Sequence, residues 1–255
     1  HVVGLLGQPK RTWAMGHSMG GHLVLGTLEA HGAAYDGGLA LCGANAPAKE
    51  LFNDALLGAL AVFEYRHPGV LSPGGLLDAD APRWPDAAKI EAALASDESF
   101  ASKFGLVFDI PREGMAGGLM LRFAVLHELR ERAGGNPVDN TGKTYGGLPQ
   151  LRDLNAGVRR YTGDAKAMEY ANARLALTGN TPRPVVLMAN EADEVIPSWI
   201  SSRYLDLARA AGRGEQVVEL PPLGQGHCRF GPEAEADALA QLRAWVVEGE
   251  RPGAD

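Results

Sequence analysis

Ser18 is the residue of this chain best placed to act as a nucleophile. It lies in the run GHSMGG (residues 16–21), with glycines two positions before it and two positions after it. A serine on a sharp turn from a strand to a helix adopts a strained backbone conformation, and neighbours without a Cβ atom make such a turn possible. The pattern G-x-S-x-G between a strand and a helix is typical of a nucleophile elbow. The alternative interpretation is an ordinary glycine-rich turn.

A serine hydroxyl needs a base within hydrogen-bond reach, and the base needs a third group to orient it. His227 lies on a glycine-flanked loop shortly after a predicted strand at 216–220, and Asp193 lies shortly after a predicted strand at 184–189. Ligands of open α/β sheets bind at the carboxyl ends of the strands, so both side chains are expected at that edge. The sequence therefore predicts a triad of Ser18, Asp193 and His227.

Other residues compete for the two supporting roles. Glu191 and Glu194 flank Asp193, and either of them is an alternative acid. His17 neighbours the serine, but its side chain is expected to point elsewhere. His127 lies on an amphipathic helical segment, where a structural role is the better interpretation. The remaining histidines that compete with the predicted base are His22, His31 and His67.

The elements that must position these residues alternate between strands and helices. Short apolar segments indicate strands at residues 11–15, 38–42, 184–189 and 216–220, and helical spacing indicates helices at 22–31, 198–211 and 232–247. Near-continuous apolar strands are typical of a parallel sheet that is covered on both faces. The predicted class is therefore α/β, with a parallel sheet.

The alternation fails between residues 44 and 182, where helices are predicted at 48–65 and 119–132. A stretch of this length favours a helical insertion, so we predict a catalytic core at 1–43 and 183–255 and a helical cap at 44–182. The apolar residues of these helices cover a substrate or, as we favour, form a second core: Phe52, Leu56, Leu60, Phe63, Leu121, Phe123 and Leu126. A polar segment at 136–147 is interpreted as a solvated loop with Asx turns rather than as a substrate contact.

Composition excludes several classes of function. The 255 residues carry a net charge of −7, and the basic residues are scattered, which argues against binding of nucleic acid. No apolar run approaches the roughly 18 residues of a membrane span. No cluster has metal-ligand spacing, so no metal or organic cofactor is expected. Cys42 and Cys228 are either two free thiols or a bridge between a strand end and the His227 loop, because the sequence does not give their separation.

Together these features resemble the α/β-hydrolase superfamily over residues 11–43 and 184–247, and most closely its serine esterases with a Gly-His-Ser-Met-Gly-Gly elbow. The runs DGGLALCG (36–43), NPVDN (136–140) and GHCRF (226–230) also resemble a subgroup of bacterial hydrolases with a long cap. The resemblance implies Ser18 as nucleophile, His227 as general base and acid, and Asp193 as the group that orients it. It also implies the backbone N–H of Met19 as one oxyanion donor.

The implied activity is hydrolysis of small carboxylic esters through an acyl-serine intermediate. The alternatives are a peptidase or thioesterase with the same triad, and a hydrolase-like binding module without catalysis.

The chain departs from this family at its front, where strands normally precede the elbow. The run HVVGLLG (1–7) reads as the end of a helix, and the loop that carries the second oxyanion donor is not found in this chain. We expect the strand of Ser18 to lie at a sheet edge. Either the chain is a fragment, which we favour, or a partner chain or second copy covers that edge. The isolated polypeptide is expected to have a half-built oxyanion hole and weak activity.

Overall fold

The computed structural model describes residues 7, 9–148 and 153–253, and these residues form two compact units. Unit 1 consists of the described parts of His1–Ala46, Leu177–Glu191 and Ser198–Asp255. Unit 2 consists of the described parts of Pro47–Ala176 and of the short segment Ala192–Pro197. The predicted boundaries place that short segment in the core, whereas it clusters with unit 2. The roles of core and cap stay predictions.

Unit 1 contains a sheet whose four described strands run in the order β1-β2-β3-β4, with every neighbouring pair parallel. The strands are β1 (Trp13–His17), β2 (Gly37–Leu41), β3 (Val185–Met188) and β4 (Val217–Glu219). Each overlaps a predicted strand, and β1 lies at one edge of the described sheet. The α/β class with a parallel sheet is therefore confirmed.

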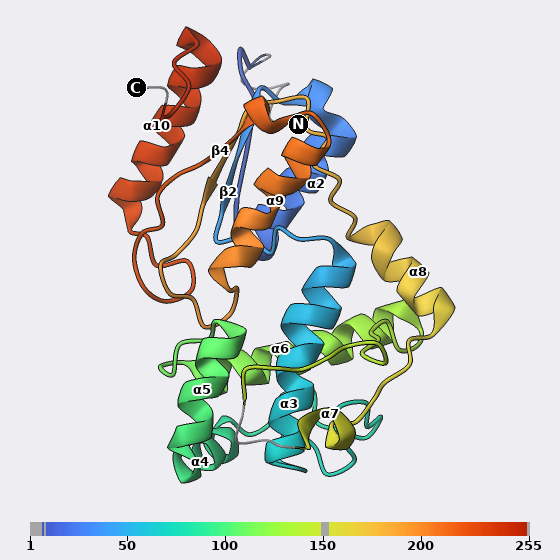
Figure 1. The fold of residues 1–255 in the computed structure, drawn as a ribbon. Coiled ribbons are helices and arrows are strands. Elements are labelled where there is room, and N and C mark those ends of the chain that lie inside the picture. Colours follow the sequence, from blue (N-terminus) through green and yellow to red (C-terminus); the bar gives the residue numbers. More distant parts are fainter. Residues whose placement is uncertain (1–6, 8, 149–152, 254–255) are drawn as a thin grey trace. The chain divides into compact units, whose positions relative to one another are not determined.

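Helices cover both faces of this sheet (Figure 1). They are α2 (Met19–His31), α9 (Ser198–Ala210) and α10 (Pro232–Glu248), and short 3₁₀ turns lie at Gly32–Ala34 (η1) and Gly214–Gln216 (η3). Successive residues of a strand point to opposite faces. Ala40 and Leu187 pack with α2 and α9, whereas Leu39 and Val186 pack with α10. This two-sided burial explains why the strands are almost wholly apolar.

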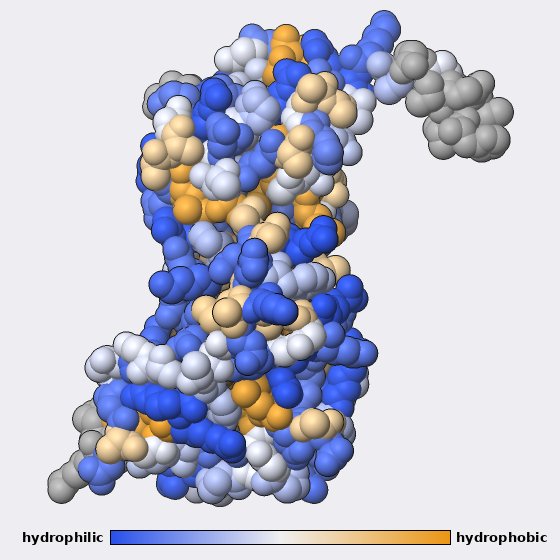
Figure 2. Space-filling view, turned by 90° about the vertical axis from the view of Figure 1, so that its right-hand side faces the viewer, coloured by the Kyte–Doolittle hydropathy of each residue, from blue (hydrophilic) through white to orange (hydrophobic). Residues whose placement is uncertain are grey.

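Unit 2 is helical and has an apolar core of its own. Its elements are η2 (Glu50–Leu57), α3 (Gly58–Arg66), α4 (Ala87–Ser96), α5 (Glu98–Phe108), α6 (Met115–Ala133), α7 (Leu154–Gly157) and α8 (Ala165–Arg174). Six of the seven apolar residues named from the sequence are buried in this core, and Leu121 is partly buried. Figure 2 shows one face of the molecule, where apolar side chains form separate patches among hydrophilic ones.

Two segments of unit 2 differ in part from what the sequence indicates. The helix predicted at 48–65 is present, but its part Glu50–Leu57 is the π-helical segment η2, which continues as α3. The segment at 136–147 does contain the expected Asx turns, but Asn136 and Asn140 are buried rather than solvated. Asn140 accepts from the N–H of Tyr161 and donates to the carbonyl of Arg159, so it joins two stretches of unit 2. A buried amide is stable only with such bonds.

The helix end predicted within residues 1–7 lies almost entirely outside the described residues. Among the described residues, no helix combines the length and the apolar character that a membrane span requires.

Candidate active site

Ser18 lies at the turn between β1 and α2 in a backbone conformation that non-glycine residues rarely adopt. Its φ is 55° and its ψ is −121°. The N–H of Ser18 donates to the carbonyl of Leu41 at the end of β2, at 2.9 Å, and so holds the turn on the sheet. Residues in such regions cost on the order of 1–3 kcal/mol and persist only where their surroundings fix them. The strain predicted for the elbow is present.

Two glycines make room for this turn, and they are not quite the pair expected. A Cβ atom on Gly16 would lie 2.5 Å from the carbonyl carbon of Gly20, and one on Gly21 would lie 2.9 Å from Cα of Gly43. A Cβ atom on Gly20 would meet nothing within 4 Å. The required glycines are therefore Gly16 and Gly21, because Gly21 faces the end of a second strand.

Met19 is the first residue of α2, directly after the serine. The first N–H groups of a helix have no partner within it, and the helix dipole places positive charge there. Met19 as a whole is 71% exposed. The role of the Met19 N–H as an oxyanion donor stays a prediction.

His227 and Ser18 are brought together, although they lie far apart in the sequence. Nε2 of His227 is 2.8 Å from Oγ of Ser18, and both side chains are partly buried. In neutral histidine the hydroxyl donates this bond to Nε2, which leaves the proton of the ring on Nδ1. The pair has the geometry of a nucleophile and its base.

Cys42 and Cys228 form a disulfide, with Cα atoms 5.4 Å apart. Of the two interpretations left open by the sequence, the bridge is therefore the one observed. Cys42 follows β2, and Cys228 follows the histidine, with its sulfur 3.5 Å from Nε2 of His227. The bridge ties the histidine loop to the sheet.

Asn190 is a second anchor of this loop that was not predicted from the sequence. Its side chain is 1% exposed, accepts from the N–H of Cys228 at 2.9 Å and donates to the carbonyl of Leu223 at 3.1 Å. The N–H of Glu191 also donates to the carbonyl of Gly224. A polar residue directly after the apolar strand predicted at 184–189 is the signal that could have revealed it.

Asp193 lies in the segment Ala192–Pro197 of unit 2 and is 4% exposed. Its Oδ1 accepts from the N–H groups of Val195 and Ile196, both at 2.8 Å, so the carboxylate closes its own turn. Of the alternative acids, Glu191 is exposed and Glu194 is partly buried. Asp193 therefore differs from these two glutamates in its burial and in the turn that its carboxylate closes.

The other histidines make contacts of a structural kind. His17 pairs with Glu235 of α10, and Nδ1 of His22 bonds the carbonyl of Ala44. Burial lowers the pKa of His22. His67 lies between the rings of Phe63 and Phe100, and burial lowers its pKa as well.

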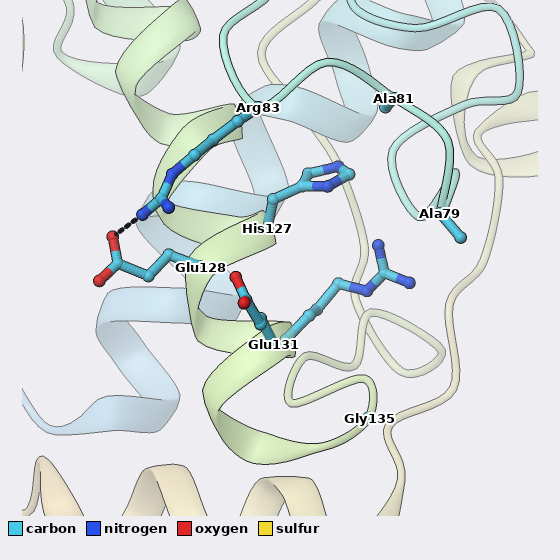
Figure 3. Close-up of a pocket in the computed structure, with 8 residues that line it drawn as sticks. Ala79, Ala81, Arg83, His127, Glu128, Glu131 and Gly135 are labelled. Carbon is cyan, nitrogen blue, oxygen red and sulfur yellow. Dashed lines mark hydrogen bonds and ion pairs between the residues drawn. The ribbon is translucent and has the colours of Figure 1, made fainter.

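A cavity of about 370 Å³ in unit 2 is lined by none of the predicted triad residues (Figure 3). Its wall includes His127, whose Nε2 bonds the carbonyl of Leu76, and the ion pair of Arg83 with Glu128. Burial lowers the pKa of His127, so the neutral ring is favoured. The structural role predicted for His127 agrees with these contacts.

One group of potential metal ligands occurs in the described part of the chain, and it consists of Cys42, His227 and Cys228. Both sulfurs are consumed by the disulfide, so this group is not suited to hold a metal ion.

No family model and no curated protein matches the sequence. Solved structures do match. An E-2-(acetamidomethylene)succinate hydrolase is 15% identical, with 94% of this chain and 69% of that chain covered and a TM-score of 0.38. Feruloyl esterase B from Aspergillus oryzae is 12% identical, with 95% and 60% covered and a TM-score of 0.44. A proline iminopeptidase from Mycobacterium smegmatis is 15% identical, with 98% and 69% covered and a TM-score of 0.37.

This chain thus spans 60% of the length of the esterase and 69% of that of each of the other two proteins.

Proposed function

We propose that this chain is a serine hydrolase of the α/β-hydrolase type that cleaves carboxylic esters of small molecules. The observation that carries the proposal is the 2.8 Å hydrogen bond between Oγ of Ser18 and Nε2 of His227, made by a serine with a φ of 55°. A strained serine that presents its hydroxyl to an imidazole is the arrangement of an activated nucleophile.

The proposed reaction has two steps. Nε2 of His227 accepts the hydroxyl proton while Oγ of Ser18 attacks the ester carbonyl, and the N–H of Met19 donates to the oxyanion. The tetrahedral intermediate collapses when the alcohol leaves with the proton from His227. Water then attacks the acyl-serine, again with His227 as base, and releases the carboxylic acid and the free serine.

Asp193 is the proposed acid that orients His227. The N–H of Glu191 bonds the carbonyl of Gly224, three residues before the histidine. Because consecutive Cα atoms are about 3.8 Å apart, the chain keeps Cα of Asp193 within about 8 Å of Cα of Glu191. With Oδ1 bound to its own turn, Oδ2 is the oxygen proposed to accept from Nδ1 of His227.

Covalent labelling tests the proposal without requiring full turnover. A fluorophosphonate is expected to modify the full chain at Ser18, as located by peptide mass spectrometry, and to leave Ser18→Ala unmodified. We expect Asp193→Asn to lower the labelling rate by about two orders of magnitude or more. Glu191→Gln serves as its matched control.

A wild-type chain that is folded but unlabelled at Ser18 would show that the site does not act as a nucleophile. If Glu191→Gln loses labelling and Asp193→Asn retains it, Glu191 rather than Asp193 is the acid. A panel of activated esters, thioesters and peptide amides then identifies the acyl class, and the proposal requires that esters react fastest.

A further inference from the structure

Arg122 is a charged side chain inside unit 2 that bonds the turn of the proposed acid. It lies on α6 and is 5% exposed. Its Nη1 donates to the carbonyl of Glu194 at 2.8 Å, and its Nη2 donates to the carbonyl of Val195 at 2.9 Å. These are the two residues that directly follow Asp193. A buried guanidinium requires such acceptors, and here they are the backbone of a single turn.

The positive charge of Arg122 also interacts favourably with the acidic side chains of this turn. Burial lowers the pKa of Arg122 to about 10, and the negative charges of Asp193 and Glu194 act in the opposite direction. The guanidinium is therefore a cation at neutral pH, close to the acidic turn. A buried cation that faces a buried carboxylate compensates part of the cost of burying either charge.

The packing of α6 against the turn leaves no space for a side chain at position 118. A Cβ atom on Gly118 would lie 2.3 Å from the carbonyl oxygen of Glu194 and 2.9 Å from Nη1 of Arg122. A Cβ atom on the adjacent Gly117 would meet nothing within 4 Å. Glycine at position 118 thus lets the helix approach the turn closely enough for the two Arg122 bonds.

We propose that Arg122 is a positioning residue: it fixes the turn of residues 192–197 so that Asp193 can orient His227. This inference rests on the proposed function. The inference goes beyond the proposed function because unit 2 then supports the acid of the reaction. From the sequence, its helices were considered only as a cover for substrate or as a second core. The residue acts on the reaction through Asp193 and does not touch the reacting atoms.

The test measures the rate of fluorophosphonate labelling of Ser18 in the full chain, separated into KI and kinact. We expect Arg122→Ala to lower kinact about tenfold or more with little change in KI, because a misplaced acid slows the chemical step. Free guanidinium chloride at tens of millimolar is expected to restore part of kinact by occupying the vacated space. The control is Arg132→Ala, which removes an exposed arginine from the same helix and is expected to show neither effect.

Labelling of Arg122→Ala at the rate of Arg132→Ala would overturn the proposal, and so would a loss that guanidinium does not relieve. If Arg122→Ala does not fold, the comparison of Gly118→Ala with Gly117→Ala decides. A lower kinact in Gly118→Ala alone supports the proposal, and equal values refute it. Failure of the proposed function would be seen in the wild type instead, as absence of labelling at Ser18.

Hydrogen exchange tests the positioning independently of activity. The amides of Val195 and Ile196 donate to Asp193, so they report whether the turn is closed. Faster exchange at these amides in Arg122→Ala than in Arg132→Ala is expected, with guanidinium slowing it again. Unchanged exchange would show that the turn holds its shape without Arg122.

Discussion

Removal of the disulfide between Cys42 and Cys228 is expected to lower the melting temperature of unit 1 substantially. The two cysteines are 186 residues apart, and all described residues of unit 2 lie between them in the sequence. Closing a loop of this length removes unfolded-chain entropy worth about 5 kcal/mol in the loop-closure model. One kcal/mol corresponds to about 2–4 °C for a chain of this size, so we expect a decrease of about 10 °C or more.

The assay is thermal unfolding followed by tryptophan fluorescence, with and without a phosphine reductant. Three of the four tryptophans belong to unit 1, namely Trp13, Trp199 and Trp245. The double variant Cys42→Ala/Cys228→Ala is the matched control. Both cysteines have a positive φ, 45° and 58°. Alanine also has a Cβ atom, so it neither relieves nor adds backbone strain at these positions.

Agreement between the reduced wild type and the double variant would assign the effect to the covalent link. The labelling rate at Ser18 is expected to fall as well, since Cys228 follows the proposed base. It is not expected to vanish, because Asn190 still bonds both arms of the loop. A decrease in melting temperature below about 3 °C in both samples would refute the reasoning from loop length.

Two further predictions concern the elbow and the pH dependence of stability. Gly16→Ala and Gly21→Ala should each destabilise the chain by about 1–3 kcal/mol and slow the labelling of Ser18. Gly20→Ala should have neither effect. Thermal melts and labelling rates measure the two effects. The free energy of unfolding should fall as the pH is lowered from about 7.5 to about 5.5. The reason is that three wholly or partly buried histidines have a folded pKa below 6.5, so the unfolded chain binds more protons there. These histidines are His22, His67 and His127. Urea unfolding at several pH values measures how steeply the free energy of unfolding changes with pH. His22→Gln should reduce this slope by at most about 1.4 kcal/mol per pH unit. A slope equal to that of the wild type would show that His22 does not contribute to the pH dependence.

The strands and the elbow could be predicted from the sequence because their signals are local. Val185–Met188 is a continuous apolar run, and a strand covered on both faces has no position that tolerates a polar side chain. The glycines around Ser18 indicate a strained turn because the backbone conformation at each position restricts which side chains fit there. The π-helical start of the segment at 48–65 left no comparable signal in the spacing of apolar residues.

The site was only partly predictable, because its supports come from segments that are distant in the sequence. The sequence indicated His227 from its place after a strand, but it gave no sign that Asn190 holds the histidine loop. It named Asp193, yet nothing near position 193 points to Arg122, which lies on a helix whose own spacing predicts only an amphipathic face. Hydrogen bonds between distant segments leave no periodic pattern.

The sequence by itself determined the α/β class, the strand positions and the candidate nucleophile, because each depends on the chemistry of neighbouring residues. Only the tertiary structure decided that Cys42 and Cys228 are bridged and that Gly21, rather than Gly20, must lack a side chain. It also decided that the turn of Asp193 is bonded to Arg122 of α6. These facts depend on distances of a few ångströms between parts of the chain that folding alone brings together.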